Sequence, residues 1–176
     1  MKKLGAFFIV LLLVVSAKSQ SLYSVKLKDI DGQPLQLNHY MHKKILFYLL
    51  PLSANDSAYQ QLVDFKQRYG DTLYIFGIPS KEDGYQASMA SNLKTLYSGL
   101  GIVLTEGMYT KKASPGQSDL CGWLTEKTKN GRSDADSKGI ASKFFTSKIG
   151  KLYAVFPPQL PLQSPVVEKI VQAVAQ

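Results

Sequence analysis

Cysteine is almost absent from this chain of 176 residues, which contains one, Cys121. A single thiol excludes an internal disulfide, a Cys-x-x-Cys redox pair and a structural zinc site built on several thiolates. Glycine-rich phosphate-binding loops are missing too, so nothing in the sequence indicates a nucleotide cofactor. Internal repeats and low-complexity tracts are also missing. The remaining pattern is that of an ordinary globular chain.

Long hydrophobic runs are scarce as well. The uncharged apolar run from Leu4 to Val15 is shorter than the ~20 residues that a membrane-spanning helix needs. Two lysines precede it and a small-residue stretch ending at Ser19 follows it, which is the layout of a secretory signal peptide. We therefore expect residues 1–19 to be a signal peptide and the mature chain to begin at Gln20. The predicted location is exported, periplasmic or secreted, without a membrane span after cleavage; an uncleaved anchor is the alternative.

Positive charge predominates, with 21 basic against 13 acidic residues and a formal charge of +8. Three of the lysines belong to the predicted signal peptide, and the mature charge is near +5. A nucleic-acid partner is therefore not expected. Seven basic residues gather between 127 and 151, where a solvated loop with flanking strand ends explains them and an anionic-partner site is the alternative. The seven are Lys127, Lys129, Arg132, Lys138, Lys143, Lys148 and Lys151.

Hydrophobic patterning predicts buried strands and amphipathic helices in alternation. The apolar runs 45–50 and 73–78 each end at a proline and are typical of central strands covered on both faces. Between them, apolar residues at helical spacing predict a helix over 57–69. Ser57 and Gln60 form a possible capping box at its start, and the glycine that follows is placed to end it.

The same patterns predict the remaining elements. Two alternating runs, 23–27 and 35–37, flank Asp31-Gly32 and predict an N-terminal β-hairpin. Downstream we expect a helix over 85–100, a short strand over 102–104 and a short helix over 118–127. A polar loop over 130–139, an antiparallel hairpin of 143–146 with 152–156 and a final helix over 166–174 follow. In the final helix, Val166, Val167, Ile170, Val171 and Val174 are expected to face inward. This order predicts an α/β fold, a three-layer sandwich with a mixed sheet.

Over residues 22 to 175 the chain resembles the glutathione peroxidase family. The stretch Lys28-Asp-Ile-Asp-Gly-Gln-Pro-Leu-Gln-Leu37 is similar to the family's opening pattern, and Gly77-Ile-Pro79 to its Gly-Phe-Pro. Leu104 to Trp123, with Pro115-Gly116 inside, is similar to its long loop and short helix, and Lys143-Phe-Phe with Gly150 to its last hairpin. The resemblance implies a thioredoxin-like core with an added N-terminal hairpin. It also implies a single domain over residues 20–176.

The chemistry that this resemblance implies is peroxide reduction by a thiol or selenol. A glutamine, a tryptophan and an asparagine support the attacking residue in that family. An alcohol is not nucleophilic enough near neutral pH, whereas a thiol of lowered pKa is. The attacking position falls on Ser53, and no residue from 51 to 56 is a cysteine.

The supporting positions are substituted in the same way. The glutamine position falls on Glu82, and the tryptophan and asparagine positions fall on Gly139 and Ile140. Four substitutions in one pocket indicate lost peroxidase chemistry. Cys121 lies in a different element among apolar neighbours, and we expect it to be a buried small hydrophobic residue.

Two other constellations carry less chemistry. Ser53 with Asp56, His39 and His42 could suggest a hydrolase, but no Gly-x-Ser-x-Gly motif surrounds the serine. The more natural role for Ser53 is to bond loop backbone or to precede a helix cap. The two histidines have no further ligand cluster, so a structural or solvated pair is favoured over a metal site. Glu82 and Asp83, followed by a glycine, suit a surface turn.

We therefore expect an exported, glutathione-peroxidase-like protein that lacks peroxidase activity and acts as a non-catalytic binding module. Its partner is an unknown small molecule or protein, bound through the remnant pocket or the basic stretch 127–151. The alternative is a thiol-dependent peroxidase with an atypical site, for example one that uses Cys121. No cofactor and no metal are expected.

Overall fold

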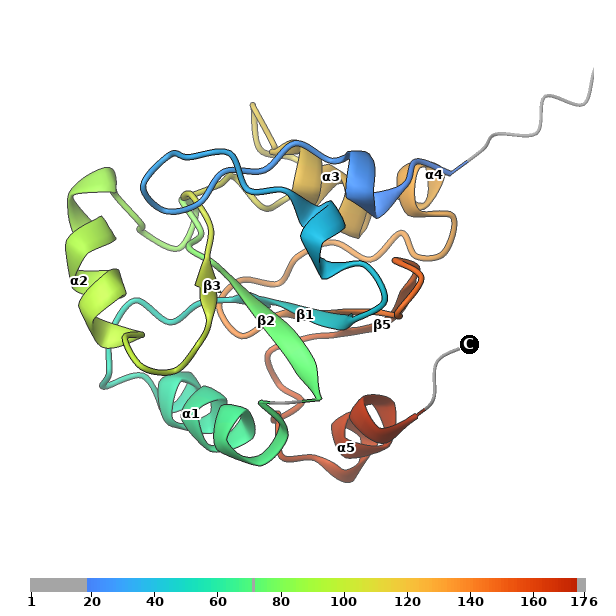
Figure 1. Cartoon of the computed structure of the whole chain (residues 1–176). Coiled ribbons are helices and arrows are strands. Elements are labelled where there is room, and N and C mark those ends of the chain that lie inside the picture. The colour runs from blue at the N-terminus through green and yellow to red at the C-terminus, as the bar shows by residue number, and fades with distance from the viewer. Residues whose placement is uncertain (1–18, 71, 174–176) are drawn as a thin grey trace, which may run out of the picture.

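A mixed five-stranded sheet lies at the centre of the computed structural model, which describes residues 19–70 and 72–173 (Figure 1). The predicted signal peptide, apart from its last residue, lies outside this range. The strand order is β3-β2-β1-β4-β5. Strands β1, β2 and β3 run parallel, and β4 is antiparallel to both β1 and β5. The strands are β1 Lys44–Leu49, β2 Leu73–Ile78, β3 Val103–Leu104, β4 Lys143–Thr146 and β5 Leu152–Phe156.

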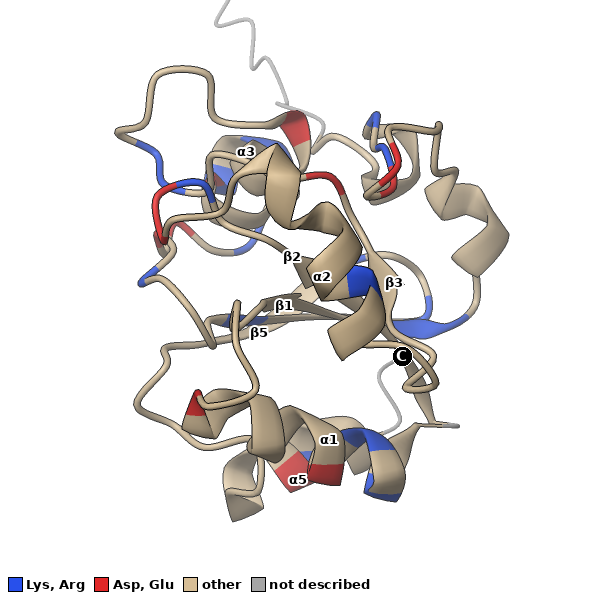
Figure 2. Cartoon of the chain, turned by 90° about the vertical axis from the view of Figure 1, so that its left-hand side faces the viewer, with Lys and Arg blue, Asp and Glu red and all other residues tan. Residues whose placement is uncertain are grey.

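Helices cover both faces of this sheet. Figures 1 and 2 show α1 and α5 on one side and α3 on the other, which confirms the predicted three-layer α/β arrangement. Within the described residues, no helix is both long and apolar enough to cross a membrane. The α-helices are α1 Ser57–Tyr69, α2 Ala90–Leu96, α3 Asp119–Thr125, α4 Lys127–Asn130 and α5 Pro165–Gln172. Short 3-10 helices span Leu22–Ser24, Leu37–Tyr40 and Ala87–Met89.

Strand β1 joins the two hydrophobic cores. All six of its residues are buried. Because side chains alternate along a strand, Phe47 lies in the core on the α3 side and Tyr48 in the core beneath α1 and α5. The continuous apolar run 45–50 predicted a central strand covered on both faces. The structure confirms this strand, which begins and ends one residue earlier than predicted.

Helix α1 has the predicted bounds but a different cap. The carboxylate of Asp56 accepts the Ala58 N–H at 2.8 Å, so Asp56 is the N-cap residue. Ser57 is already the first helical residue, and the side-chain amide of Gln60 donates instead to Asp64 at 2.7 Å. The predicted capping box is therefore wrong, since an aspartate one residue earlier supplies the acceptor.

The N-terminal segment reverses direction where the hairpin was predicted, but without regular strands. The Leu35 N–H donates to the Leu27 carbonyl at 2.8 Å, and Lys28 forms an isolated antiparallel bridge with Pro34. On either side the chain turns into the 3-10 helices Leu22–Ser24 and Leu37–Tyr40. These turns bury Leu22 and Leu37 in the core on the α3 side.

Three helical predictions also need correction. The helix expected over 85–100 is a 3-10 turn followed by the shorter α2. The helix expected over 118–127 ends at Thr125, and residues 127–130 form the separate single turn α4. In α5, Val167 and Val171 are buried and Ile170 packs against the core, whereas Val166 is half exposed. Val174 lies outside the described residues.

One member of the basic stretch is not solvated. Lys143 is only 1% exposed. Its ammonium group donates to the carbonyls of Ala141 at 2.6 Å and Pro157 at 3.3 Å, and it lies over the Tyr48 ring. Burial lowers the pKa of Lys143 to about 8. The other six basic residues of the stretch are exposed or half exposed, as predicted.

The Lys143→Met variant should have a flatter pH dependence of stability. Between its lowered folded-state pKa of about 8 and the ordinary value of 10.5, only the unfolded chain holds the proton, so raising the pH stabilises the fold. Wild type should gain about 2 kcal/mol relative to Lys143→Met from about pH 7.5 to about pH 9.5, measured by urea unfolding. The exposed Lys138→Met is the control, and parallel curves for wild type and Lys143→Met would contradict the buried amine.

Candidate functional site

Three loops meet at one end of the sheet. The carboxyl ends of the parallel strands lie at the same end of the sheet. Strand β4 begins at that end because it runs antiparallel to β1. The Leu50 N–H donates to the Ile78 carbonyl at 2.9 Å, and the Ala141 N–H donates to the Leu49 carbonyl at 2.8 Å. The predicted positions Ser53, Glu82, Gly139 and Ile140 all lie on these three loops.

Ser53 serves its own loop. Its side chain is exposed, its hydroxyl accepts the Asn55 N–H at 3.2 Å, and its carbonyl accepts the Asp56 N–H at 3.3 Å. The expectation that Ser53 bonds loop backbone is confirmed. Among the described residues, no hydrogen bond joins Ser53 to Glu82 or to Gly139.

The carboxylate of Glu82 accepts several hydrogen bonds from a neighbouring loop. It accepts the N–H groups of Thr110 at 2.8 Å and Lys111 at 3.0 Å, and the Ser114 hydroxyl. Burial alone would raise the pKa of Glu82, but the hydrogen bonds from Lys111, Ser114 and Thr110 outweigh it and lower the pKa to about 2. The predicted turn is present, but the side chain is engaged inward rather than solvated. Glu82 therefore holds the loop 110–114 against the end of β2.

A hydroxyl relay connects Glu82 to Gly139. The Thr110 hydroxyl lies 3.4 Å from the Glu82 carboxylate and 3.3 Å from the Ser137 hydroxyl, which accepts the Gly139 N–H at 3.4 Å. Sequence reasoning missed Thr110, Ser114 and Ser137. Single hydroxyl residues in polar loops have no spacing that would have indicated this network.

Asp83 occupies the space beside Gly139. A Cβ atom at Gly139, where φ is +94°, would lie 3.1 Å from one Asp83 carboxylate oxygen. The other oxygen of Asp83 is buried and has no hydrogen-bond partner within the described residues. Both the left-handed backbone and the carboxylate exclude a large ring at position 139. Ile140 is half buried against the core beneath α1.

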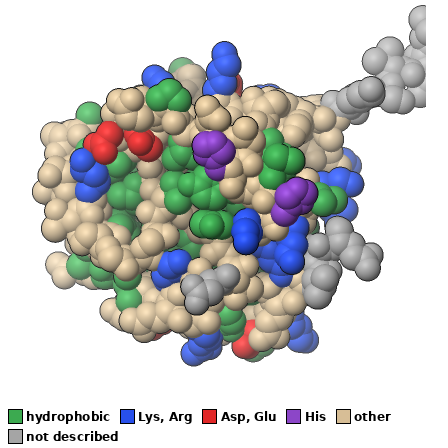
Figure 3. All heavy atoms as spheres, in the orientation of Figure 1, with side chains coloured by type: hydrophobic (Ala, Val, Ile, Leu, Met, Phe, Trp, Pro, Cys, Tyr) green, Lys and Arg blue, Asp and Glu red, His purple; other side chains and the backbone are tan. Residues whose placement is uncertain are grey.

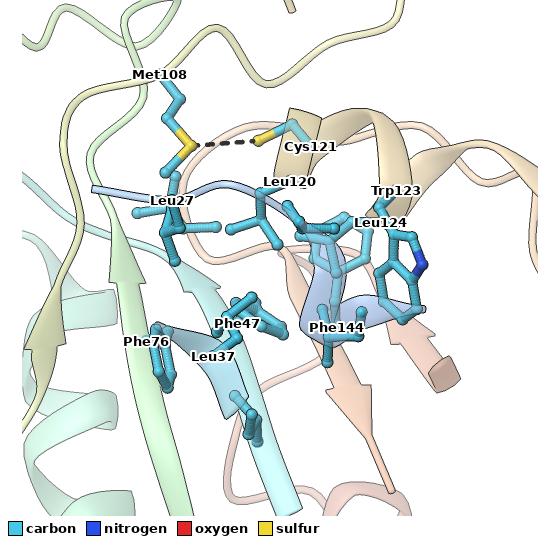
Figure 4. Packing of buried hydrophobic residues seen from close by; sticks show 14 of the residues in the cluster. Leu27, Leu37, Phe47, Phe76, Met108, Leu120, Cys121, Trp123, Leu124 and Phe144 are labelled. Atoms are coloured by element: carbon cyan, nitrogen blue, oxygen red, sulfur yellow. Dashed lines mark hydrogen bonds between the residues drawn. The ribbon is translucent and has the colours of Figure 1, made fainter. Parts of the chain in front are cut away.

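The thiol of Cys121 is enclosed by apolar side chains. Cys121 is 2% exposed, on α3, and its sulfur lies 4.0 Å from that of Met108 (Figure 4). Burial raises the pKa of Cys121 to about 12; the Ser118 hydroxyl lowers it slightly, and the negative charge of Glu82 raises it further. The prediction of a buried small hydrophobic residue is confirmed.

This thiol lies behind the hydroxyl relay. Thr110, Ser137 and Cys121 line one small internal hollow together with apolar residues of β1, α3 and β4. The arrangement brings a thiol near the site but denies it both solvent and a cationic partner. A thiolate at Cys121 would be unstable there.

The two histidines are remote from this end of the sheet. Both are exposed, and Figure 3 shows them on the molecular surface. His42 precedes β1 whereas Ser53 follows it, so the strand separates them. His42 and Ser53 do not form a catalytic pair.

A hollow of larger volume lies elsewhere and was not predicted. It is a groove of about 650 Å³ formed by the N-terminal segment, residues 23–28 and 34–38, with Glu106, Ser118 and Asp119. Two lysines and two acidic residues line it, so the groove favours neither a cationic nor an anionic ligand. Its apolar lining comes from the two N-terminal stretches where the hairpin strands were predicted, and of these residues Tyr23 and Leu37 belong to 3-10 helices.

Known structures share this architecture. The structure of Trgpx in its apo form has a TM-score of 0.65 and 16% identity, over 88% of this chain and 98% of that one. T. cruzi GPX1 has a TM-score of 0.60 and 12% identity, over 86% and 94%. An uncharacterized thioredoxin-like protein from Porphyromonas gingivalis has a TM-score of 0.53 and 15% identity, over 89% and 94%. No protein-family model and no curated protein matches the chain. At these identities the similarity shows the fold, and it confirms the thioredoxin-like prediction.

The Glu82→Gln variant should loosen the loop 110–114. An amide cannot accept as strongly from two backbone N–H groups and a hydroxyl, so the free energy of unfolding should fall by about 2 kcal/mol. Because the pKa of Glu82 is lowered to about 2 from 4.5, wild type should lose this stabilisation as the pH falls through that window, and the variant should not.

Urea unfolding from about pH 2 to about pH 7 measures both effects. Glu126→Gln is the matched control, since Glu126 forms only a surface ion pair with Lys129 at 2.8 Å and should change stability by less than about 1 kcal/mol. Equal losses in the two variants would contradict the anchoring role of Glu82.

Proposed function

We propose that this chain is an exported, glutathione-peroxidase-like protein that has no peroxidase activity and serves as a non-catalytic binding module. The observation that carries the proposal is the placement of sulfur. The loop after β1 contains no thiol, and the thiol of Cys121 is buried in the core with a raised pKa. Reduction of a peroxide by a thiol begins with attack by the thiolate.

The fraction of thiolate is the limiting quantity. At a pKa of about 12, roughly one Cys121 side chain in 100,000 is ionised at neutral pH, and the closed core keeps peroxide away from it. A sulfenic acid at Cys121 would also have no second cysteine in the chain to resolve it. Serine at position 53 does not replace the thiol, because among the described residues its hydroxyl has no hydrogen bond to a base.

The closed state of the remnant pocket favours the basic stretch as the binding surface. Glu82 is engaged by the loop 110–114, and Asp83 lies against Gly139, where supporting side chains of the resembled family belong. Six of the seven basic residues between 127 and 151 remain at the surface. A partner carrying negative charge is complementary to that surface.

A peroxide-consumption assay on the chain from Gln20 onward tests the proposal, with glutathione and thioredoxin as separate reductants. We expect wild type and Cys121→Ser to consume hydrogen peroxide at the same rate as buffer. Turnover by wild type that Cys121→Ser abolishes would contradict the proposal and establish the alternative, a peroxidase that uses Cys121.

A gain-of-thiol variant makes the test sharper. Ser53→Cys should react with an alkylating reagent, because position 53 is exposed, yet give little turnover. The matched control is Ala54→Cys, an exposed thiol one residue further along. Full activity of Ser53→Cys alone would mean that the surrounding loops still form a working peroxidase site.

A further inference from the structure

Strand β5 leaves one edge of the sheet open. Within the described residues it pairs only with β4, in the register Phe144 opposite Val155 and Lys143 opposite Phe156. Residues 132–138 run past its outer side, but among the described residues no backbone hydrogen bond joins them to β5. An edge strand with unpaired backbone groups can accept a further strand.

The ladder determines which amide faces outward. The Leu49 N–H donates to the Ser142 carbonyl at 3.1 Å, so Ser142 directs its backbone groups toward β1. Along β4, successive residues direct their backbone N–H and carbonyl groups alternately toward β1 and toward β5. Phe144, two residues after Ser142, therefore also directs its backbone groups toward β1. Val155, opposite Phe144, therefore directs its N–H and carbonyl away from β4, to the open side.

A groove follows this edge. One hollow of about 210 Å³ lies between Arg132, Ser133 and Ala135 on one side and Leu152–Val155 on the other. A second, of about 220 Å³, lies between Ala135–Lys138 and Val155–Pro157. Val155, whose N–H is directed to the open side, lines both hollows.

Three cationic residues and one carboxylate, Asp136, line the groove and its continuation. Arg132 and Lys138 line these two hollows, and a third hollow of about 250 Å³ continues from Arg132 to Lys151. None of these cations forms an ion pair within the described residues. The carboxylate of Asp136 accepts the N–H groups of Lys112 at 3.1 Å and Ser137 at 2.7 Å, so it is already engaged.

These charges decide between possible occupants. Two copies of this chain paired edge to edge would bring the same cations into one interface, where like charges repel. An extended segment with acidic side chains would instead pair its backbone with Val155 and its carboxylates with Arg132, Lys138 and Lys151. Strand addition of this kind draws affinity from the main chain and selectivity from the side chains.

We propose that the open edge of β5 binds an acidic, extended peptide segment of a partner protein as an added strand. This inference rests on the proposed binding role and names its surface and partner chemistry. The probe is a fluorescent decapeptide of alternating valine and threonine with two glutamates at each end, and the reference peptide has lysines in their place. We expect the acidic peptide to bind at least about tenfold more tightly, with an affinity that falls as salt is added.

Variants at the edge separate backbone pairing from simple charge attraction. Val155→Pro removes the outward N–H and should weaken binding about tenfold, whereas Val155→Ala keeps the N–H and should change it less than about threefold. Arg132→Glu with Lys138→Glu should weaken binding further. The charge-matched control Lys26→Glu with Lys28→Glu, on the N-terminal segment, should not. Circular dichroism of each variant verifies folding, and amide exchange at Val155 should slow in the complex.

Four outcomes would overturn the inference: no binding of the acidic peptide, equal binding of polyglutamate, unchanged exchange at Val155, or a dimer in sedimentation that Val155→Pro dissociates. None of these four outcomes bears on whether the protein is a peroxidase. The peroxide assay tests that separately on the same wild-type sample. Peroxide turnover together with peptide binding would overturn the proposed catalytic inactivity and leave the edge site in place.

Discussion

The burial of β1 on both faces is the constraint on which the rest of the structure depends. A six-residue strand with no exposed side chain needs a covering layer on each side, β2 and β4 at its edges, and loops that leave at the same end. Helices α1 and α5 supply one layer, and α3 with the N-terminal turns supplies the other. The end of β1 is thereby fixed as the place where three loops converge, whatever residues those loops carry.

In this chain the convergent loops carry a structural anion rather than a reactive sulfur. Glu82 gathers the amides of the loop 110–114, and Asp83 fills the space next to Gly139. The Glu82 contacts form a closed polar network. The negative charge of Glu82 also disfavours a thiolate at Cys121. The carboxylate that anchors the loop 110–114 therefore also contributes to the raised pKa of the buried thiol.

Hydrophobic patterning predicted the fold well where one pattern decides the outcome. The runs 45–50 and 73–78 could only be central strands, and α1 followed from its apolar stripe. Prediction was weaker where local hydrogen bonding competes with periodicity, as at the Asp56 cap and the 3-10 turns near Leu22 and Leu37. Lys143 looked like a surface residue because its two carbonyl partners come from turns that no sequence pattern brings together.

The four site positions could be placed on loops from the resemblance, and the absence of a thiol from residues 51–56 is a property of the sequence alone. The Thr110–Ser137 relay could not be predicted, because it joins residues 27 positions apart through side chains that many loops contain. The pattern of exposed lysines indicated a basic surface but not the groove beside β5, which depends on where residues 132–138 pass the sheet edge.

The most direct test of the central claim is the native-state reactivity of Cys121. Mass spectrometry should follow alkylation by iodoacetamide at neutral pH, with urea-unfolded protein as reference. If the thiol is buried with its pKa raised to about 12, it should stay unmodified in folded protein and react at once after unfolding. Rapid labelling of the folded protein, or a sulfenic acid at Cys121 after brief exposure to peroxide, would contradict the account.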